Sequence, residues 1–230
     1  MNVALLTAAG SGTRMHQEIP KQFLHVQDKP LIVHTMERFQ VHPSIDAICV
    51  VTLPAWAEVL KAYARQFGIT KLRWVENGGA TGQESIHNGL VAIAKDCTDD
   101  VVVMIHDGNR CLVSQQIISD SLSTFAKHGS AVAAIPCVEV VFRSEDGRSS
   151  SDSIPREQLW RTQTPHTFKL GDLLWAHDEA SRLKMIDTAA TCDLMWRLGR
   201  KVWFSLGSEE NLKVTTQDDL HILEALLSMR

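Results

Sequence analysis

Residues 2–24 read NVALLTAAGSGTRMHQEIPKQFL, and this stretch decides the fold. The apolar run from Val3 to Leu6 is typical of a buried parallel strand, and the small residues after it predict a tight loop at its carboxyl end. Glycine and alanine let backbone amides approach a ligand closely, so such a loop can hold an anion. Arg14 and Lys21 place two cations beside the loop, which suits a polyanion such as a triphosphate.

The loop matches neither of two common phosphate-binding motifs. Met15 stands where the dinucleotide-binding fingerprint has its third glycine, which disfavours a dinucleotide-dependent oxidoreductase. The glycine run also does not end in the Gly-Lys-Ser or Gly-Lys-Thr of a P-loop. Taken alone, the stretch is also compatible with an ordinary strand-to-helix turn that carries solvated basic residues.

Length, charge and cysteine usage limit the class of protein. A chain of 230 residues fits one large α/β domain, which we expect to span residues 1–230. A net charge of -4 without any basic run argues against a nucleic-acid surface. Five cysteines without a C-x-x-C pair argue against a disulfide framework and a structural zinc site. Because the longest apolar run, Val101 to Ile105, cannot span a bilayer and no secretory signal is recognisable, we expect a cytoplasmic protein.

Strand-like and helical segments alternate along the rest of the chain. After the first strand, the expected strands are residues 47–53, 71–75, 101–105, 130–136 and 201–206. The expected helices are residues 30–39, 55–67, 84–94, 117–128, 170–183, 191–198 and 217–227. This order predicts an α/β fold with an open, mostly parallel sheet flanked by helices, which binds ligands beyond the carboxyl ends of its strands.

Residues 138–165 do not continue the alternation of strands and helices. Val138 to Phe142 is strand-like, the tip at 144–153 is polar, and the return through Trp160 carries apolar residues again. We expect a β-arm that projects from the sheet and is stable only if something covers its apolar face. A second copy of the chain could provide that cover, and a poorly ordered surface loop is the alternative.

Two acidic residues are candidate metal ligands. Asp107 ends a buried strand beside Gly108, a usual position for a carboxylate that holds a divalent cation against phosphate oxygens. It could instead cap the next element. Glu210 is a possible second ligand, although by itself it is typical of a solvated turn residue.

Further motifs extend over nearly the whole chain. They comprise Ala8 to Met15 with Pro20 to Phe23, Gly78 and Gly79 with Ser85 and Asn88 to Leu90, His106 and Asp107 with Arg110, Ile154 to Pro165, and Asn211 to Thr215. In this order they resemble the cytidylyltransferases of polyol phosphates, a family that includes methylerythritol-phosphate and ribitol-phosphate enzymes. Both join a phosphate oxygen of the acceptor to the α-phosphorus of CTP and release pyrophosphate. The resemblance implies a Rossmann-like nucleotidyltransferase fold, Mg²⁺, and a homodimer interlocked by the β-arm.

The resemblance also implies roles for individual residues. The nucleotide would be held by Ala8, Ala9, Gly10, Ser11, Gly12, Thr13, Gly79 and Ser85, with Asp107 carrying the cation. Catalysis would depend on Arg14, Lys21 and Lys213, because in-line phosphoryl chemistry requires positioning and positive charge rather than a covalent nucleophile. Arg110 and Arg156 would bind the acceptor phosphate through their guanidinium groups. Because Arg156 lies on the arm, it would contribute to the site of a neighbouring subunit.

Several positions depart from the family pattern. Val140 replaces an expected threonine, Gly82 stands where arginine is usual, and Ala189 and Ala190 stand where a Thr-Asp pair is expected. We infer that the transfer machinery is retained and the acceptor pocket is rebuilt. The first choice of acceptor is D-ribitol 5-phosphate and the next is 2-C-methyl-D-erythritol 4-phosphate. The alternative is a nucleotide-binding protein without turnover that acts as a sensor or partner.

Overall fold

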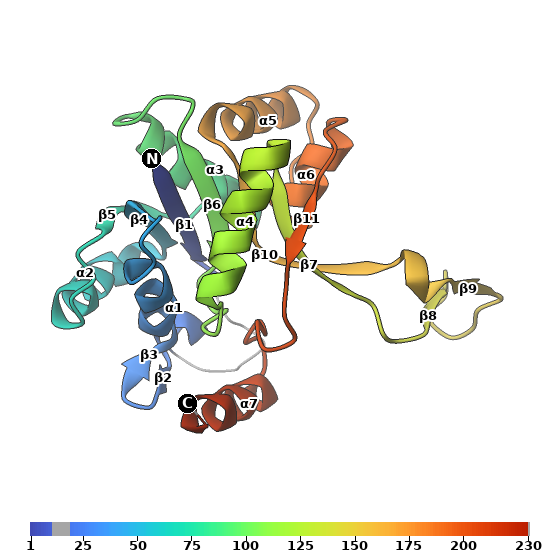
Figure 1. Ribbon diagram of the computed structural model, residues 1–230, viewed down its shortest axis with the longest axis horizontal. Helices are drawn as coiled ribbons and strands as arrows, with labels where there is room; N and C mark the ends of the chain where they lie inside the picture. The colour runs from blue at the N-terminus through green and yellow to red at the C-terminus, as the bar shows by residue number, and fades with distance from the viewer. Residues whose placement is uncertain (11–18, 230) are drawn as a thin grey trace.

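The computed structural model describes residues 1–10 and 19–229. Within these residues seven strands form one sheet in the order β11-β7-β10-β6-β1-β4-β5 (Figure 1). They are β1 (Asn2–Ala8), β4 (Ala47–Thr52), β5 (Leu72–Asn77), β6 (Val102–Asp107), β7 (Ala131–Pro136), β10 (Trp160–Lys169) and β11 (Phe204–Leu206). Strand β10 runs antiparallel to both β6 and β7, and the other pairs are parallel. The predicted mostly parallel sheet is therefore confirmed.

Helices cover both faces of the sheet. One apolar core contains residues of α3 (Gly82–Ala94), α5 (Leu170–Arg182) and α6 (Thr191–Arg197), and the other contains residues of α1 (Leu31–Gln40), α2 (Ala57–Gln66) and α4 (Gln115–His128). Val3 and Leu5 of β1 pack into the first core, and Ala4 and Leu6 pack into the second. A strand covered on both faces needs such a continuous apolar run, which is the reason β1 could be recognised from sequence.

The remaining elements are short or peripheral. They are the 3-10 turns η2 (Lys21–Phe23), η3 (Pro54–Trp56) and η4 (Arg156–Gln158), the hairpin of β2 (His25–Val26) and β3 (Lys29–Pro30), and the final helix α7 (Gln217–Ser228). Helix α7 contributes Leu220 and Leu223 to a small third core that also contains Val214. Across the part of the chain that the structure describes, no helix is long and apolar enough to cross a bilayer.

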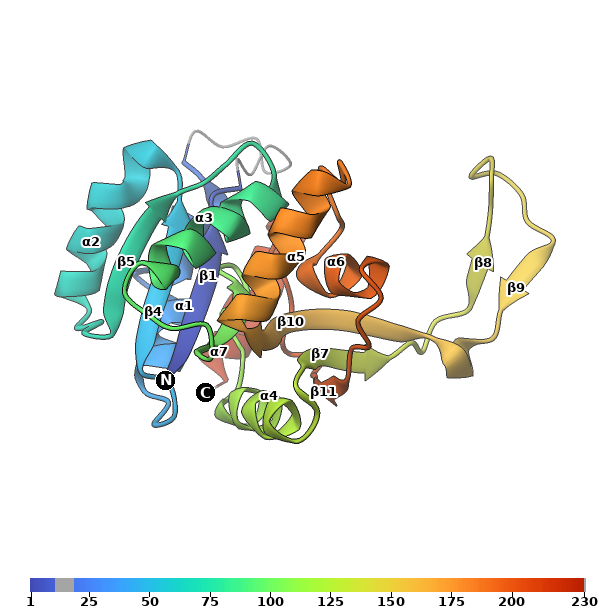
Figure 2. The same ribbon diagram turned by 90° about the horizontal axis from the view of Figure 1, so that it is seen from above.

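The projecting arm is shorter than the sequence predicts. Strands β8 (Val141–Arg143) and β9 (Asp152–Ile154) pair with each other and extend away from the sheet (Figures 1 and 2). The prediction that residues 160–165 belong to the arm is wrong, because β10 begins at Trp160 and lies between β6 and β7 inside the sheet. Its inner part, TQTPHT, is polar, so the sequence does not show that most of it is buried.

Candidate active site

A cavity of about 470 Å³ lies at the carboxyl ends of β1 and β6. These strands are parallel neighbours, with Thr7 opposite Asp107, so the chain segments that follow them emerge at the same edge of the sheet. The residues that line the cavity include Ala9, Gly10, Lys21, Ser85, Asp107, Arg110 and Lys213. The structure thus brings the two predicted lysines and the predicted carboxylate together around one cavity.

The turn after β6 fixes the position of Asp107. The amide of Gly108 donates to the carbonyl of Thr7 at 2.9 Å, and the Thr35 hydroxyl donates to the carbonyl of Gly108 at 2.9 Å. A Cβ atom at Gly108 would lie 2.8 Å from the Thr7 carbonyl oxygen and 2.9 Å from Ile32, so only glycine fits there. This close approach holds the end of β6 against β1.

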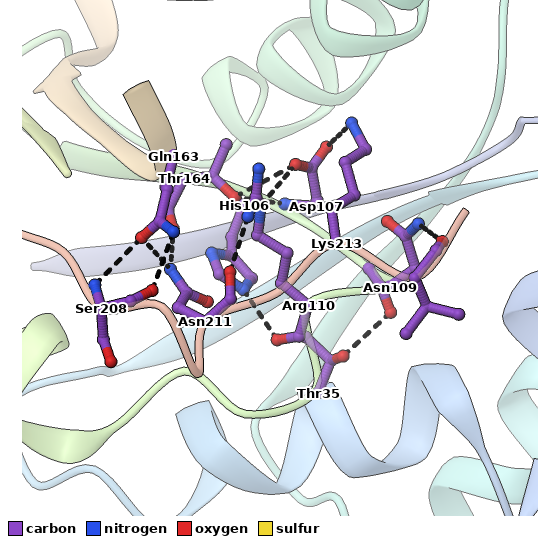
Figure 3. A network of polar contacts seen from close by, with 12 residues as sticks. Thr35, His106, Asp107, Asn109, Arg110, Gln163, Thr164, Ser208, Asn211 and Lys213 are labelled. Atoms are coloured by element: carbon purple, nitrogen blue, oxygen red, sulfur yellow. Dashed lines mark hydrogen bonds and ion pairs between the residues drawn. The ribbon is translucent and has the colours of Figure 1, made fainter. Parts of the chain in front are cut away.

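Asp107 forms ion pairs with two cations (Figure 3). Its Oδ2 accepts from Nε of Arg110 at 2.9 Å, and its Oδ1 accepts from Nζ of Lys213 at 2.9 Å. Burial raises the pKa of the Asp107 carboxyl, but Lys213 and Arg110 outweigh burial and hold the pKa well below its usual range. The carboxylate is therefore ionised at neutral pH, and this group of three side chains carries one net positive charge.

A segment late in the chain delivers Lys213 to this cluster. Asn211 is fully buried, and its Nδ2 donates to the carbonyl of Thr164 at 2.9 Å and to Oε1 of Gln163 at 3.2 Å. Arg110 donates to the carbonyl of Asn211 at 2.6 Å (Figure 3). These bonds attach the segment to β10 and to the turn after β6, two residues before Lys213.

Strand β10 supplies polar groups that the sequence analysis gave no role. The backbone amide of Asp107 donates to Oγ1 of Thr164 at 3.0 Å, and His166 lines the cavity. Burial lowers the pKa of His166 to about 4, and it lowers the pKa of His106 to about 4 as well. Both imidazoles are therefore neutral at neutral pH. In His106, which belongs to β6, Nε2 donates to the carbonyl of Arg110 at 3.2 Å. The polar sequence of β10 does not indicate that this part of the strand is buried.

The end of β1 packs closely against the turn after β5 beside the cavity. Ala9 and Gly10 line the cavity, and Ala8 is buried. A Cβ atom at Gly78 would lie 2.3 Å from Cβ of Ala9, so the two backbones approach closely. The amide of Gly79 donates to Oγ of Ser85 at 3.0 Å. Four predicted loop residues, Ser11, Gly12, Thr13 and Arg14, lie outside the described residues.

Four predicted site residues in the described part of the chain do not line this cavity, and they are Ala8, Gly79, Arg156 and Glu210. Arg156 is exposed on the arm, where it donates to the carbonyl of Val138 at 3.4 Å. Glu210 is also exposed, and its backbone amide donates to Ser208 at 3.2 Å. Their predicted roles stay predictions.

The donor set at Asp107 limits how a metal could bind. In the described part of the chain, no group of three or more His, Cys, Asp or Glu side chains could hold a metal ion. A single carboxylate in the cavity fits a cation that takes most of its oxygen ligands from substrate phosphates and water, which is the usual mode for Mg²⁺. It does not fit a metal caged by protein side chains.

A second wall of the cavity, distinct from the charged cluster, contains residues that the sequence motifs did not include. Gln83, His177 and Thr188 line it, beside the small residues Gly82, Ala189 and Ala190. Figure 2 shows the helices that carry part of this wall, α3 and α5, side by side over the sheet. The only sequence signal for this wall was that Gly82, Ala189 and Ala190 depart from the family pattern.

Comparisons with known proteins identify the family to which this chain is similar. The sequence profile of the 2-C-methyl-D-erythritol 4-phosphate cytidylyltransferase (IspD) family matches residues 2–229. A ribitol-5-phosphate cytidylyltransferase of Lacticaseibacillus paracasei is 40% identical over 229 residues, covering 99% of this chain and 98% of the relative. A 2-C-methyl-D-erythritol 4-phosphate cytidylyltransferase of Geotalea uraniireducens is 37% identical over 225 residues, covering 97% and 95%. The crystal structure of such an enzyme from Thermus thermophilus has a TM-score of 0.77 at 27% identity and covers 97% of this chain and 98% of that one.

Proposed function

The chain belongs to the 2-C-methyl-D-erythritol 4-phosphate cytidylyltransferase family, and from this premise we propose that it transfers CMP from CTP to D-ribitol 5-phosphate. The family and its curated relatives establish a CTP-dependent nucleotidyltransferase that acts on a polyol phosphate. The single observation that carries the proposed chemistry is the convergence of Lys21, Asp107, Arg110 and Lys213 on one cavity. The choice of ribitol over methylerythritol rests on the 40% identity to a ribitol-5-phosphate enzyme.

In the proposed reaction a phosphate oxygen of the acceptor attacks the α-phosphorus of CTP. A new P–O bond forms, the bond from the α-phosphorus to the oxygen bridging to the β-phosphate breaks, and pyrophosphate leaves with the negative charge. Lys213 and Lys21, together with Arg14, stabilise the charge that builds on the α-phosphoryl oxygens. Arg110 holds the acceptor phosphate through its guanidinium group.

Nucleotide binding is assigned to the loop after β1 and to the start of α3. Ala8 to Thr13 would hold the triphosphate with backbone amides, and Gly79 and Ser85 would face the cytosine and ribose. Ala9, Gly10 and Ser85 line the cavity, which supports this assignment.

Mg²⁺ is the proposed cofactor, with Asp107 as its main protein ligand. When bound, it supplies charge neutralisation and orientation of the triphosphate. Asp107 is already ionised and lies beside the cavity, which suits this role. Glu210 is the proposed second ligand, with less support because it is exposed and does not line the cavity.

We also propose that two chains form a homodimer through their arms. Val140 and Phe142 on the arm are 67% and 56% exposed, which leaves an apolar face uncovered. Arg156 of one subunit would then reach the cavity of the other. Sedimentation should give a dimer for the wild type and a monomer for Phe142→Asp, whereas Glu145→Lys at the polar tip should remain dimeric. A monomeric wild type would exclude this assembly.

The proposed reaction is tested by pyrophosphate release from CTP and Mg²⁺ with each acceptor in turn. We expect a higher kcat/KM with D-ribitol 5-phosphate than with 2-C-methyl-D-erythritol 4-phosphate. The reverse order would transfer the assignment to methylerythritol. Saturable CTP binding without pyrophosphate release for any polyol phosphate would instead favour the non-catalytic sensor or partner, a possibility raised by the departures at Gly82, Ala189 and Ala190.

A further inference from the structure

A second part of the cavity lining, the wall formed by Gln83, His177 and Thr188, is polar but carries no charge that phosphate chemistry could use. Burial, with a smaller contribution from His87, lowers the pKa of His177 to about 4. The imidazole is therefore neutral at neutral pH, with one nitrogen that donates a hydrogen bond and one that accepts. This wall suits the neutral part of a substrate.

His177 has an unmet hydrogen-bonding requirement. Its side chain is buried at 7% exposure, and its ring lies against that of His87 with the centroids 5.1 Å apart. Nε2 of His177 is buried and has no hydrogen-bond partner among the described residues. A buried polar atom without a partner is unfavourable, so a rotation of the ring that brings this nitrogen to a ligand hydroxyl in the cavity would restore a lost interaction.

Gln83 fixes the hydroxyl of Thr188 at the same wall. Oε1 of Gln83 accepts from both the amide and the hydroxyl of Thr188 at 3.0 Å, and its Nε2 donates to the carbonyl of Met185 at 2.9 Å. The hydroxyl hydrogen of Thr188 is thus directed to Gln83, and the lone pairs of its oxygen remain as acceptors. Gln83 is a positioning residue, and Thr188 presents an acceptor to the cavity.

Small residues leave room in front of these groups. A Cβ atom at Gly82 would meet nothing within 4 Å, and Ala189 and Ala190 line the same wall with short side chains. This open space fits a flexible chain of hydroxyl-bearing carbons.

We propose that His177 and Thr188 bind the hydroxyl groups of the acceptor's carbon chain, so that this wall selects the polyol while the charged wall binds phosphate. The inference rests on the proposed function, because it names the part of the site that recognises the polyol. It predicts that loss of either polar group weakens acceptor binding and leaves CTP binding intact.

The test uses two substitutions that keep shape and remove hydrogen bonding, His177→Phe and Thr188→Val. Each should raise KM for D-ribitol 5-phosphate about tenfold and leave KM for CTP within twofold. His177→Gln and Thr188→Ser should recover most of the loss. Matched controls are His128→Phe, whose ring stacks on Trp203, and Thr70→Val, whose hydroxyl accepts from Gln40; neither residue lines the cavity.

The outcomes separate this inference from the proposed function. A tenfold rise in KM for CTP with KM for the acceptor unchanged would assign the wall to the nucleotide and overturn the inference, as would no change in either. If the wild type releases no pyrophosphate with any polyol phosphate, the proposed function fails. Calorimetric titration of D-ribitol 5-phosphate without CTP then tests the inference separately. Binding that either variant weakens tenfold supports recognition of the polyol by His177 and Thr188, and absence of binding overturns it.

Discussion

The cavity wall at the strand ends carries paired charges, whereas the wall formed by α3, α5 and the segment before α6 carries neutral polar groups. On the first wall Asp107, Arg110 and Lys213 hold one another in place through ion pairs 2.9 Å long. On the second, Gln83 holds Thr188, and Nε2 of His177 has no partner among the described residues. On the proposed assignment, charge is fixed where phosphorus would react, while recognition of the acceptor chain could change on the helices without disturbing it.

The strongest test of this difference between the two walls is to remove the side chain of Lys213. Lys213→Ala should lower kcat by about 10²- to 10³-fold and weaken CTP binding less than tenfold, because its charge matters most as charge builds on phosphorus. Lys201→Ala is the matched control, since Lys201 lies over the Trp203 ring and does not line the cavity. Steady-state kinetics and CTP titration measure the two effects. Equal losses in rate and affinity would make Lys213 a simple binding residue.

A second prediction concerns the stability of the charged wall at low pH. The folded-state pKa of Asp107 is depressed, so its ion pairs contribute stability above the unfolded-state pKa near 4, and this contribution is lost as the pH falls towards the folded value. Between pH 6 and pH 3, the unfolding free energy should fall about 1 kcal/mol more for the wild type than for Asp107→Asn. Urea unfolding at both pH values measures this. Identical pH dependence in the two proteins would show that the ion pairs do not contribute.

The smallest predicted effect tests the neutral wall. Gly82→Arg should lower kcat/KM for the acceptor about fivefold, because a guanidinium group would occupy space and bring charge beside His177 and Thr188. Gly82→Ala is the control and should stay within twofold. Neither should lower the melting temperature, because a Cβ atom at Gly82 meets nothing within 4 Å. Unchanged kinetics in Gly82→Arg would show that this space is not used by the acceptor.

The charged wall was largely predictable from sequence, and the neutral wall was not. Asp107 could be recognised because it ends an apolar strand, and Lys213 because it falls in a motif of known order. The sequence could not reveal that Arg110 and Lys213 share the two oxygens of Asp107, since these partners lie 3 and 106 residues away.

The errors in the fold have a similar origin. Strand β10 was assigned to the arm through Pro165 because most of its buried residues are polar, and Thr164 and His166 among them line the cavity. His177 and Thr188 belong to no motif, and only their contacts reveal them. Periodicity identifies elements that pack through apolar faces, but it does not identify polar residues buried for binding.

The attachment of Asn211 to β10 has a consequence for how the enzyme is made on the ribosome. Every strand of the sheet precedes Asn211 in the chain, so each strand leaves the exit tunnel before Lys213 does. Until Lys213 emerges, the Asp107 carboxylate lacks one of its two cationic partners, and the nascent chain lacks one of the cations proposed for turnover. Catalytic competence would therefore wait for the final part of the chain to emerge.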